Sequence, residues 1–350
     1  MSITRTLIIS TALVLAAVFA APSGSAPAAP RPGVITSYTD LTVVDAHDTH
    51  VTGVNLSGVV AGYFGVAPDG AVTHGFTATR TKKVTTITPV DVPGATSTVV
   101  TSINDSGSLS GTYWTGDGAQ HGFIRVGDAF STFDDPALVT TDVISYGTVA
   151  TGINASGVVV GYSFTVGPDL LTDPEGNEIG PVTRNYGFVR SSGGDFTAYS
   201  APGATVGSTQ LFGINNLGDM VGTYSYLVDP FEPGPDTRNR GFVLTADDPP
   251  TFTEIVDPSS LVPVNACGWT EPHAINDAGV IVGEAGNGCD GTSQGWLLSG
   301  AGGTFTYPIY RSGRDTAQVT TPSSINNNGI IGGTWGSGIG VSHGFTATLR

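Results

Sequence analysis

Apolar and polar residues alternate along this chain in short runs that are separated by turn-forming residues. Val, Ile, Thr, Phe and Tyr dominate the runs, as in 97–104, and Gly, Asn, Asp or Pro bound them. An apolar pattern at i, i+3, i+4 and i+7 persists over three turns nowhere. The pattern therefore predicts an all-β protein built from short strands.

One phrase recurs six times. It consists of a small residue, Ile or Val, Asn, two variable residues, Gly, a short and mostly apolar stretch, and Gly again. The asparagines are Asn55, Asn104, Asn154, Asn215, Asn276 and Asn326, at intervals of 49, 50, 61, 61 and 50 residues. A period of this size indicates a repeat architecture.

The Asn-x-x-Gly core of the phrase predicts a hairpin turn. Asn suits the first position of a type I turn because its side chain caps the backbone, and Gly suits the left-handed position that follows. We therefore assign these asparagines a conformational role. The residue two before each Asn is always small, which predicts close contact with neighbouring backbone. These residues are Gly53, Ser102, Gly152, Gly213, Ala274 and Ser324.

Each period contains four predicted strands. The second leaves the turn, the third begins at Gly followed by an aromatic residue, as in Gly75-Phe76, and the fourth reads Phe-Thr or similar, as in 196–199. In three copies His74, His121 or His343 precedes that Gly, and we expect these rings to pack or hydrogen-bond at the strand entry. Four short antiparallel strands per period are typical of a β-propeller blade.

The two ends of the chain complete one unit. The last copy stops at Arg350 after its third strand, whereas residues 38–45 precede the first phrase and have no unit of their own. We expect them to pair, which predicts a six-bladed β-propeller closed by the N-terminal strand and leaves few free edges. An open β-repeat solenoid is the alternative.

The combination of Gly-Ile-Asn-x-x-Gly-x-Val-Val-Gly with His-Gly-Phe resembles the extracellular HAF repeat family, which is named for a His-Ala-Phe tripeptide. In this chain the middle residue is Gly, as in His343-Gly-Phe345. The resemblance spans residues 35–350 and implies a secreted repeat protein. It implies neither a reaction nor functional residues.

The N-terminus predicts export. Arg5 precedes an apolar run from Leu7 to Ala20, which fits a secretory signal peptide over 1–20, with an alternative cleavage position as late as 28. Residues 21–34 read as a flexible leader and 35–350 as a single propeller domain. We therefore expect a secreted, extracellular protein with no membrane span, and an uncleaved N-terminal anchor is the alternative.

The formal net charge is −16, with 29 acidic residues against 13 Lys and Arg. Such an acidic protein is not a natural partner of nucleic acid or of an anionic membrane surface. We expect a monomer whose partner is an extracellular ligand, with a glycan or a cell surface favoured.

Two long inserts lie between the second and third strands of the third and fourth units, at 167–180 and 229–236. Their oxygen-bearing side chains suit Ca²⁺, although the spacing matches no EF-hand, and solvated loops are the alternative. The Ca²⁺ hypothesis concerns Asp173, Glu175, Asn177 and Glu178. The predicted ligand-binding residues are His47, Asp48, Asp173, Glu175, Glu178, Glu232 and Asp236. No cofactor is required by the sequence.

The fifth unit contains both cysteines. If Asn276 opens the turn, the residue numbers of partners across the hairpin add up to about 555. Cys267 then faces position 288, next to Cys289. In a secreted chain this register predicts a disulfide.

Polar residues on the first strands are the candidate catalytic groups. Glu271 and His273 of the fifth unit, together with His50 of the first, could converge at the mouth of a central channel. Carboxylates with imidazoles can bind a metal or perform acid–base chemistry, and exposed residues without a joint role are the alternative. The sequence contains no nucleophile elbow, HExxH, P-loop or dinucleotide-binding fingerprint.

These observations predict a non-enzymatic, ligand-binding propeller that uses the loops opposite the Asn turns to bind a glycan, peptide or cell surface. An extracellular polysaccharide hydrolase or lyase is the first alternative. A structural envelope protein is the second.

Overall fold

The structure is a computed structural model of the chain. It describes residues 35–67, 72–81, 84–138, 141–172, 178–227, 237–258, 268–287, 292–300, 302–307, 319–336 and 341–349. The predicted signal peptide and leader, residues 1–34, lie outside these ranges. No helix in the described residues is long and apolar enough to cross a membrane.

The described chain consists of 24 strands in six units of four, with each Asn phrase between the first and second strand of a unit. Unit one contains β2 (Asp48–Val54), β3 (Val60–Gly65), β4 (Thr73–Thr81) and β5 (Val84–Val90). Unit two contains β6 (Ser97–Ile103), β7 (Leu109–Trp114), β8 (Gln120–Val126) and β9 (Ala129–Phe133). Unit three contains β10 (Ser145–Ile153), β11 (Val159–Thr172), β12 (Glu178–Arg190) and β13 (Phe196–Tyr199).

The remaining units follow the same order. Unit four contains β14 (Gln210–Ile214), β15 (Met220–Leu227), β16 (Thr237–Leu244) and β17 (Phe252–Ile255). Unit five contains β18 (Gly268–Ile275), β19 (Val280–Asn287), β20 (Thr292–Ser299) and β21 (Phe305–Thr306). Unit six contains β22 (Val319–Ile325), β23 (Ile330–Gly336), β24 (Ser342–Leu349) and β1 (Ile35–Leu41).

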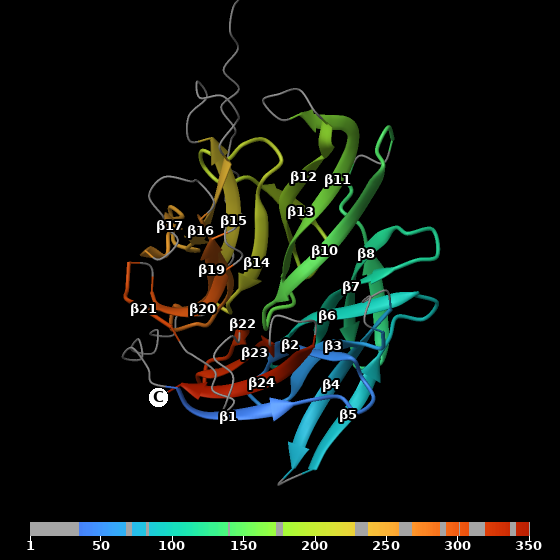
Figure 1. Cartoon of the computed structure of the whole chain (residues 1–350), viewed down its shortest axis with the longest axis vertical. Helices are drawn as coiled ribbons and strands as arrows, with labels where there is room; N and C mark the ends of the chain where they lie inside the picture. Colours follow the sequence, from blue (N-terminus) through green and yellow to red (C-terminus); the bar gives the residue numbers. More distant parts are fainter. Residues whose placement is uncertain are drawn as a thin grey trace, which may run out of the picture.

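Each unit is an antiparallel sheet that resembles a propeller blade, so the all-β prediction is confirmed. The strands form four four-stranded sheets and one eight-stranded sheet. The larger sheet joins units two and three through a single parallel pair, Gly147 with Gln120. Figure 1 shows the units arranged in chain order around a common middle, with the first strand of each unit toward that middle.

The Asn-x-x-Gly turn forms as predicted. In the first copy the amide of Gly58 donates to the carbonyl of Asn55 at 3.0 Å. The Asn55 side chain accepts from the amide of Val59 at 2.9 Å. The Gly that ends each turn has a positive φ, from 72° to 94° across the six copies. Only Gly adopts this conformation without strain, which explains its recurrence.

The small residue two before each Asn lies against the next unit, as predicted. A Cβ on Gly213 would lie 2.8 Å from the carbonyl oxygen of His273. A Cβ on Gly53 would lie 2.9 Å from the side chain of Ile103. The first strands of neighbouring units are therefore packed closely around the middle of the molecule.

The core lies between and within the sheets. The aromatic residue after the Gly of each third strand is buried at 0 or 1% exposure. These residues are Phe76, Phe123, Phe188, Phe242, Trp296 and Phe345. The ring of Phe76 covers Gly62 of the neighbouring strand, where a Cβ would also lie 1.9 Å from the carbonyl oxygen of His50. A large ring over a glycine is thus one packing unit that recurs.

The two ends of the chain share one sheet. β1 pairs antiparallel with β24, from Ile35 opposite Leu349 to Leu41 opposite Gly344, and is the outer strand of unit six. The expected pairing is therefore present, but its bounds differ from the predicted 38–45. The strand begins earlier and ends at Leu41, because residues 42–47 turn toward β2.

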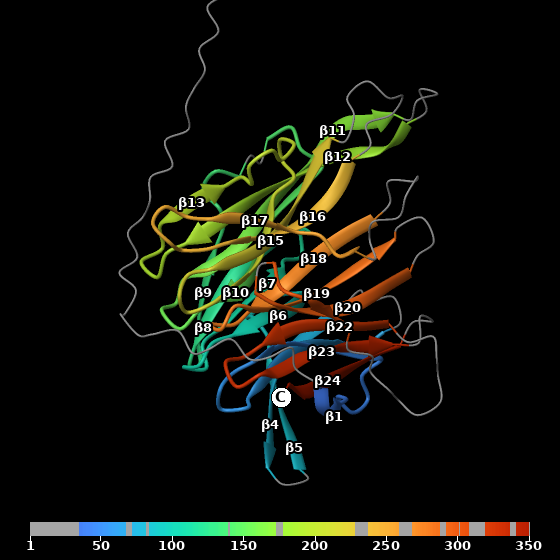
Figure 2. The same cartoon turned by 90° about the vertical axis from the view of Figure 1, so that its left-hand side faces the viewer.

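The insert of unit three is a correction to the sequence analysis. Most of 167–180, expected as a loop, continues the strands, because β11 extends to Thr172 and β12 begins at Glu178. Figure 2 shows this hairpin projecting beyond its neighbours. An antiparallel ladder satisfies the backbone groups that a loop would leave to solvent. The insert 229–236 lies outside the described residues.

Candidate functional site

The strand directions give the molecule two distinct ends. The Asn turns lie at one, which we call the turn end. The connections between second and third strands and the crossovers between units lie at the other, which we call the loop end. The first strand of every unit runs from the loop end to the turn end.

The turn end is occupied by a circuit of hydrogen bonds, which we call the asparagine circuit. The side-chain amide of each repeat Asn donates to the backbone oxygen of the Asn in the next unit. From unit one onward the distances are 3.3, 2.9, 3.3, 3.1 and 3.2 Å, and Asn326 returns to Asn55 at 3.0 Å. All six residues are buried. The side chains of these six asparagines are therefore used by the fold.

A cavity opens between the first strands near the asparagine circuit. Residues from all six units line it, among them Thr52, Phe212 and His273, and its volume is about 90 Å³. Pockets that enclose small organic ligands measure roughly 300–1,000 Å³. The cavity by itself therefore has room for a few water molecules, and a larger ligand would have to extend beyond it.

A buried Thr lies six residues before each Asn, and in units one to five it attaches the crossover loop to the first strand. In unit two the hydroxyl of Thr98 accepts from the amide of Val92 at 3.1 Å. In unit five Thr270 accepts from the amide of Asp257 at 3.0 Å. The six residues are Thr49, Thr98, Thr148, Thr209, Thr270 and Thr320. The sequence analysis missed this position, although its identity in all six copies was a readable signal.

The first strands carry a bulge three residues before each Asn. At this position the hydroxyls of Thr52, Thr101 and Thr151 donate to backbone oxygens of the next unit's first strand at 2.7, 2.8 and 2.9 Å. His273 is the equivalent residue of unit five, and its Nδ1 lies 2.8 Å from the oxygen of Pro322. His273 therefore joins units five and six as the threonines join the others.

Glu271 and His273, two of the three candidate catalytic residues, lie next to each other on β18. The Nε2 of His273 is 3.4 Å from Oε1 of Glu271, and the two side chains are 17% and 38% exposed. Burial alone would lower the pKa of His273, but the hydrogen bond and charge of Glu271, with smaller contributions from Pro322 and Glu284, raise it. The Glu271 carboxylate therefore favours the protonated imidazolium form of His273.

Two further groups surround this pair. Glu284 lies opposite Glu271 on the adjacent strand β19 and accepts from the hydroxyl of Thr321 at 3.0 Å. Tyr162 of β11 approaches from unit three. Burial, assisted by the charge of Glu271, raises the pKa of Tyr162 to about 12, so its phenol stays protonated.

A second group gathers at the start of unit one. His47 and His50 each lie 3.8 Å from an oxygen of Asp48, which also accepts from the amide of Gly65 at 2.7 Å. The ring of His50 stacks on Tyr63 at 4.5 Å. Burial lowers the pKa of His50 despite the nearby Asp48, so this imidazole is neutral near pH 7.

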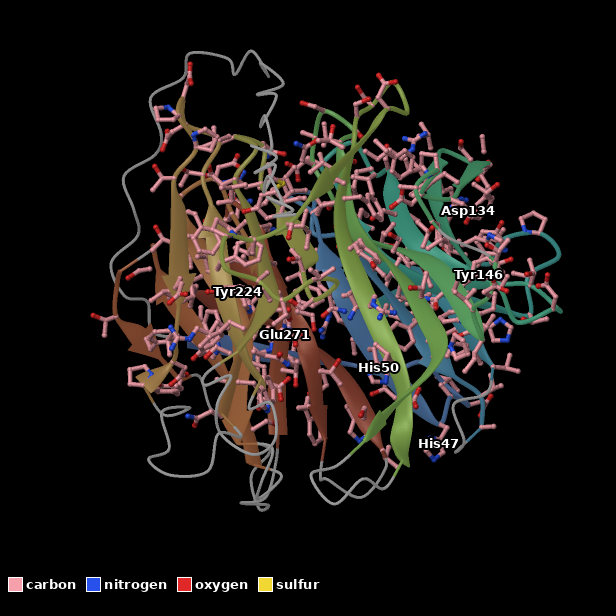
Figure 3. All side chains as sticks on the ribbon, turned by 90° about the horizontal axis from the view of Figure 1, so that it is seen from above. His47, His50, Asp134, Tyr146, Tyr224 and Glu271 are labelled. Atoms are coloured by element: carbon pink, nitrogen blue, oxygen red, sulfur yellow. The ribbon has the colours of Figure 1, made fainter. Side chains whose placement is uncertain are left out.

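Unit six connects the two groups. Thr321, which bonds Glu284, is the cross-strand partner of Thr334, and the Thr334 hydroxyl lies 3.4 Å from Nδ1 of His50. We call the connected set the polar arc. It consists of Glu271, His273, Glu284, Thr321, Thr334, His50 and Asp48. In the described residues no hydrogen bond or ion pair joins Glu271 directly to His50 or His47, and Figure 3 shows the three labels apart.

The strand-entry histidines have the role that was expected. His74 lies 3.1 Å from Asp91, and His121 lies 2.9 Å from Asp134. Each ring also packs on the aromatic residue opposite it, as His343 does on Trp335 at 4.5 Å. These contacts explain the histidines without a metal.

The loop end also carries most of the exposed apolar side chains. Among the described residues, seven of the ten exposed large hydrophobics lie there. They are Val44, Val66, Val72, Ile144, Tyr186, Val206 and Val341. The remaining three, Leu56, Val84 and Val126, lie at the turn end. Among the described residues the exposed apolar side chains are therefore distributed unequally between the two ends.

Several predicted site residues cannot be placed. Asp173, Glu175, Asn177, Glu232 and Asp236 lie outside the described residues, as does the side chain of Glu178. In the part of the chain that the structure describes, no three His, Cys, Asp or Glu side chains form a group suited to a metal ion.

Cys267 and Cys289 also lie outside the described residues, but their flanking register is clear. Gly268 faces Asn287 and Glu271 faces Glu284. This is the predicted pairing, in which partners sum to 555.

No protein-family model and no curated protein matches the chain. The HAF resemblance is therefore a resemblance of motifs only.

Solved structures with a similar fold exist at low identity. A protein of unknown function from Dyadobacter fermentans has 10% identity and a TM-score of 0.50 over 91% of this chain and 100% of that one. A streptogramin B lyase has 12% identity and a TM-score of 0.41 over 90% and 97%. The β-propeller domain of the Trilobed protease from Pyrococcus furiosus has 8% identity and a TM-score of 0.41 over 86% and 94%. These likenesses concern the fold alone.

Proposed function

We propose that the six units form a closed six-bladed β-propeller and that the exported protein binds an extracellular ligand at its loop end. The closed ring is supported by the asparagine circuit, in which Asn326 bonds Asn55. It is also supported by β1, which adds the fourth strand to unit six. An open solenoid would have no reason to bring the first and last repeats together.

The observation that carries the binding function is the asymmetry between the two ends. Backbone and asparagine side chains satisfy one another at the turn end. The loop end exposes apolar residues such as Val44 and Val206, at 83% and 86% exposure. The polar arc extends from Asp48, at the loop-end start of β2, to His273, which lines the cavity near the asparagine circuit. Surfaces that combine apolar area with a few polar groups are typical of binding sites.

A glycan is the favoured ligand class. Carboxylates of Glu271, Glu284 and Asp48 accept hydrogen bonds from sugar hydroxyls, and Thr321 and Thr334 offer hydroxyls that donate or accept. Tyr63 and Tyr162, both partly buried, add aromatic rings with polar hydroxyl ends, although one face of Tyr63 is covered by the ring of His50. The carboxylates disfavour an anionic ligand, so a neutral or cationic glycan fits best.

Binding to a panel of neutral, cationic and anionic polysaccharides, with and without a chelator, tests this function. The matched variants are V44S/V206S at the loop end and V84S/V126S at the turn end, because all four valines are at least 62% exposed. We expect the loop-end pair to weaken binding several-fold and the turn-end pair to leave it unchanged. Equal losses from both pairs, or no binding to any member, would overturn the proposal.

One observation favours catalysis as a second candidate. Glu271 lies 3.4 Å from Nε2 of His273 and raises the pKa of this imidazole, and an imidazole paired with a carboxylate can serve acid–base chemistry on a polysaccharide. The same panel scores release of shorter products. Turnover by the wild type that E271Q abolishes would establish a hydrolase or lyase. Binding without product release would favour the non-enzymatic module.

A further inference from the structure

His273 occupies a position that the repeat otherwise fills with a hydroxyl. Thr52, Thr101 and Thr151 donate to the next unit's backbone oxygen at this bulge. His273 makes the equivalent contact through Nδ1 to the oxygen of Pro322 at 2.8 Å. A carbonyl oxygen only accepts, so Nδ1 carries a hydrogen whatever the charge of the ring. The proton that His273 gains or loses is therefore on Nε2.

That nitrogen faces a carboxylate. Nε2 lies 3.4 Å from Oε1 of Glu271. When protonated, it neutralises much of the Glu271 charge. When deprotonated, it presents a lone pair to the carboxylate, and Glu271 loses its counter-charge. One proton on His273 thus decides the net charge of this part of the polar arc.

Few other groups affect this equilibrium. Glu284 of β19 contributes a second negative charge, and Tyr162 of β11 remains a neutral phenol beside Glu271. β14 contributes Phe212, whose ring centroid lies 6.3 Å from that of His273 with the two rings nearly perpendicular. β22 contributes Pro322 and the hydroxyl residues beside it. The two carboxylates therefore dominate, and they raise the pKa of His273 against the effect of burial.

We propose that His273 controls the ligand site through its proton: a protonated Nε2 neutralises Glu271, and its deprotonation frees Glu271 to bind a cationic group of the ligand. This inference rests on the proposed function, because it assigns a charge and a control to the same site. Binding of the cation to Glu271 releases one proton from His273 to solvent. No other bond forms or breaks.

Linkage fixes the size and direction of the effect. While His273 is mostly protonated, affinity for a permanently charged cation increases by up to about tenfold per pH unit, because one proton must leave. The affinity levels off above the raised pKa of His273. A neutral ligand of the same shape shows no such dependence.

The test compares choline, which keeps its charge at every pH, with its neutral isostere 3,3-dimethylbutan-1-ol. Titration calorimetry of the full secreted chain between pH 5.5 and pH 9 is expected to show choline binding that strengthens with pH and releases protons. The isostere is expected to bind weakly at every pH. Choline affinity that is constant across this range, or undetectable at pH 9, would overturn the inference.

The repeats supply the variants. His273→Thr restores the residue of units one to three and retains a donor to Pro322, so we expect it to fold and to bind choline without the pH dependence. Glu271→Gln introduces the residue that unit four has at Gln210, and it should remove choline binding. A pH dependence that survives in His273→Thr contradicts the inference.

A measurement without ligand separates this inference from the proposed function. NMR titration of the imidazoles should give His273 a pKa above its ordinary value in the wild type and a lower one in Glu271→Gln. If the pKa of His273 is the same in the wild type and in Glu271→Gln, the control of Glu271 by His273 is refuted, even if the protein binds a member of the polysaccharide panel. If Glu271 raises the pKa of His273 as expected but the protein binds no polysaccharide of the panel, the proposed function is refuted instead.

Discussion

The side-chain amide of Asn326 donates a 3.0 Å hydrogen bond to the backbone oxygen of Asn55, 271 residues earlier in the chain. The side-chain oxygen of Asn326, Oδ1, accepts from the backbone amides of Asn328 and Ile330 in the turn. One residue thus shapes a local hairpin and joins the last repeat to the first. The same double role recurs in every copy, so stability is distributed around the asparagine circuit.

Replacing Asn326 by Asp should destabilise the protein by about 2 kcal/mol, because the donor to Asn55 is lost and a carboxylate faces a buried carbonyl. The turn acceptors are retained. Urea unfolding of this variant and of Asn104→Asp, which affects the equivalent bond to Asn154, measures the effect. We expect similar losses. A much smaller loss for Asn326→Asp would indicate that the ring is not closed.

The N-terminal strand should contribute to stability although it lies outside the repeats. A chain that starts at Thr42 lacks β1 and leaves the edge of β24 unpaired. We expect its melting temperature to fall by roughly 10 °C or more. A chain that starts at Ile35 retains every described strand and is the matched control. Equal melting temperatures of the two chains would contradict closure by β1.

Gly161→Ala should destabilise the protein by roughly 1–3 kcal/mol through overpacking. The added methyl group would lie 2.0 Å from the oxygen of Val149 and 2.7 Å from the ring of Phe188. Gly116→Ala is the control, because nothing lies within 4 Å of its Cβ position. Thermal unfolding should distinguish the two variants, and equal stability would show that the close packing is not required.

Cys267 and Cys289 should form a disulfide. The pairing of Gly268 with Asn287 brings the two strands together one residue after Cys267 and two residues before Cys289. Such a bridge should stabilise by about 3 kcal/mol. Peptide mapping of the protein, produced in an oxidising compartment and kept without reductant, should recover the crosslinked pair. Quantitative alkylation of both thiols before reduction would contradict this prediction.

The contribution of His273 to stability should decrease as the pH rises. Its folded pKa is raised, so the stabilisation is complete below the ordinary value of about 6.5 and is lost as the pH passes the folded value. His50 acts in the opposite direction, because burial lowers its pKa and folding weakens as the pH falls. Urea unfolding of the wild type and of His273→Thr between pH 5 and pH 9 should show a difference that shrinks with pH. A difference that grows would contradict the assignment.

Much of the fold could be predicted because its signals are local. The Asn turns, four strands per unit, the register of the unit-five hairpin and the pairing of the two ends follow from alternation, turn chemistry and the period. The unit-three hairpin could not be predicted, because the Pro and Gly residues of 167–180 suggest a loop. Ladder pairing with the opposite strand outweighs those preferences.

The candidate site was only partly predictable. The chemical types of Glu271, His273 and His50 marked them as candidates, but no spacing rule joins residues of units five, six and one. The two threonines that connect them, Thr321 and Thr334, have no distinguishing feature in the sequence.

The sequence by itself determined the repeat, its turns and the residue types on the first strands, because these depend on interactions within a few residues. Only the tertiary structure decided which neighbour each side chain meets. The side-chain amide of Asn326 contacts Asn55 because the first strands of all units pack around a common centre. The Nε2 of His273 contacts Glu271 within the same arrangement. Contacts between units depend on that arrangement, and a linear pattern does not record it.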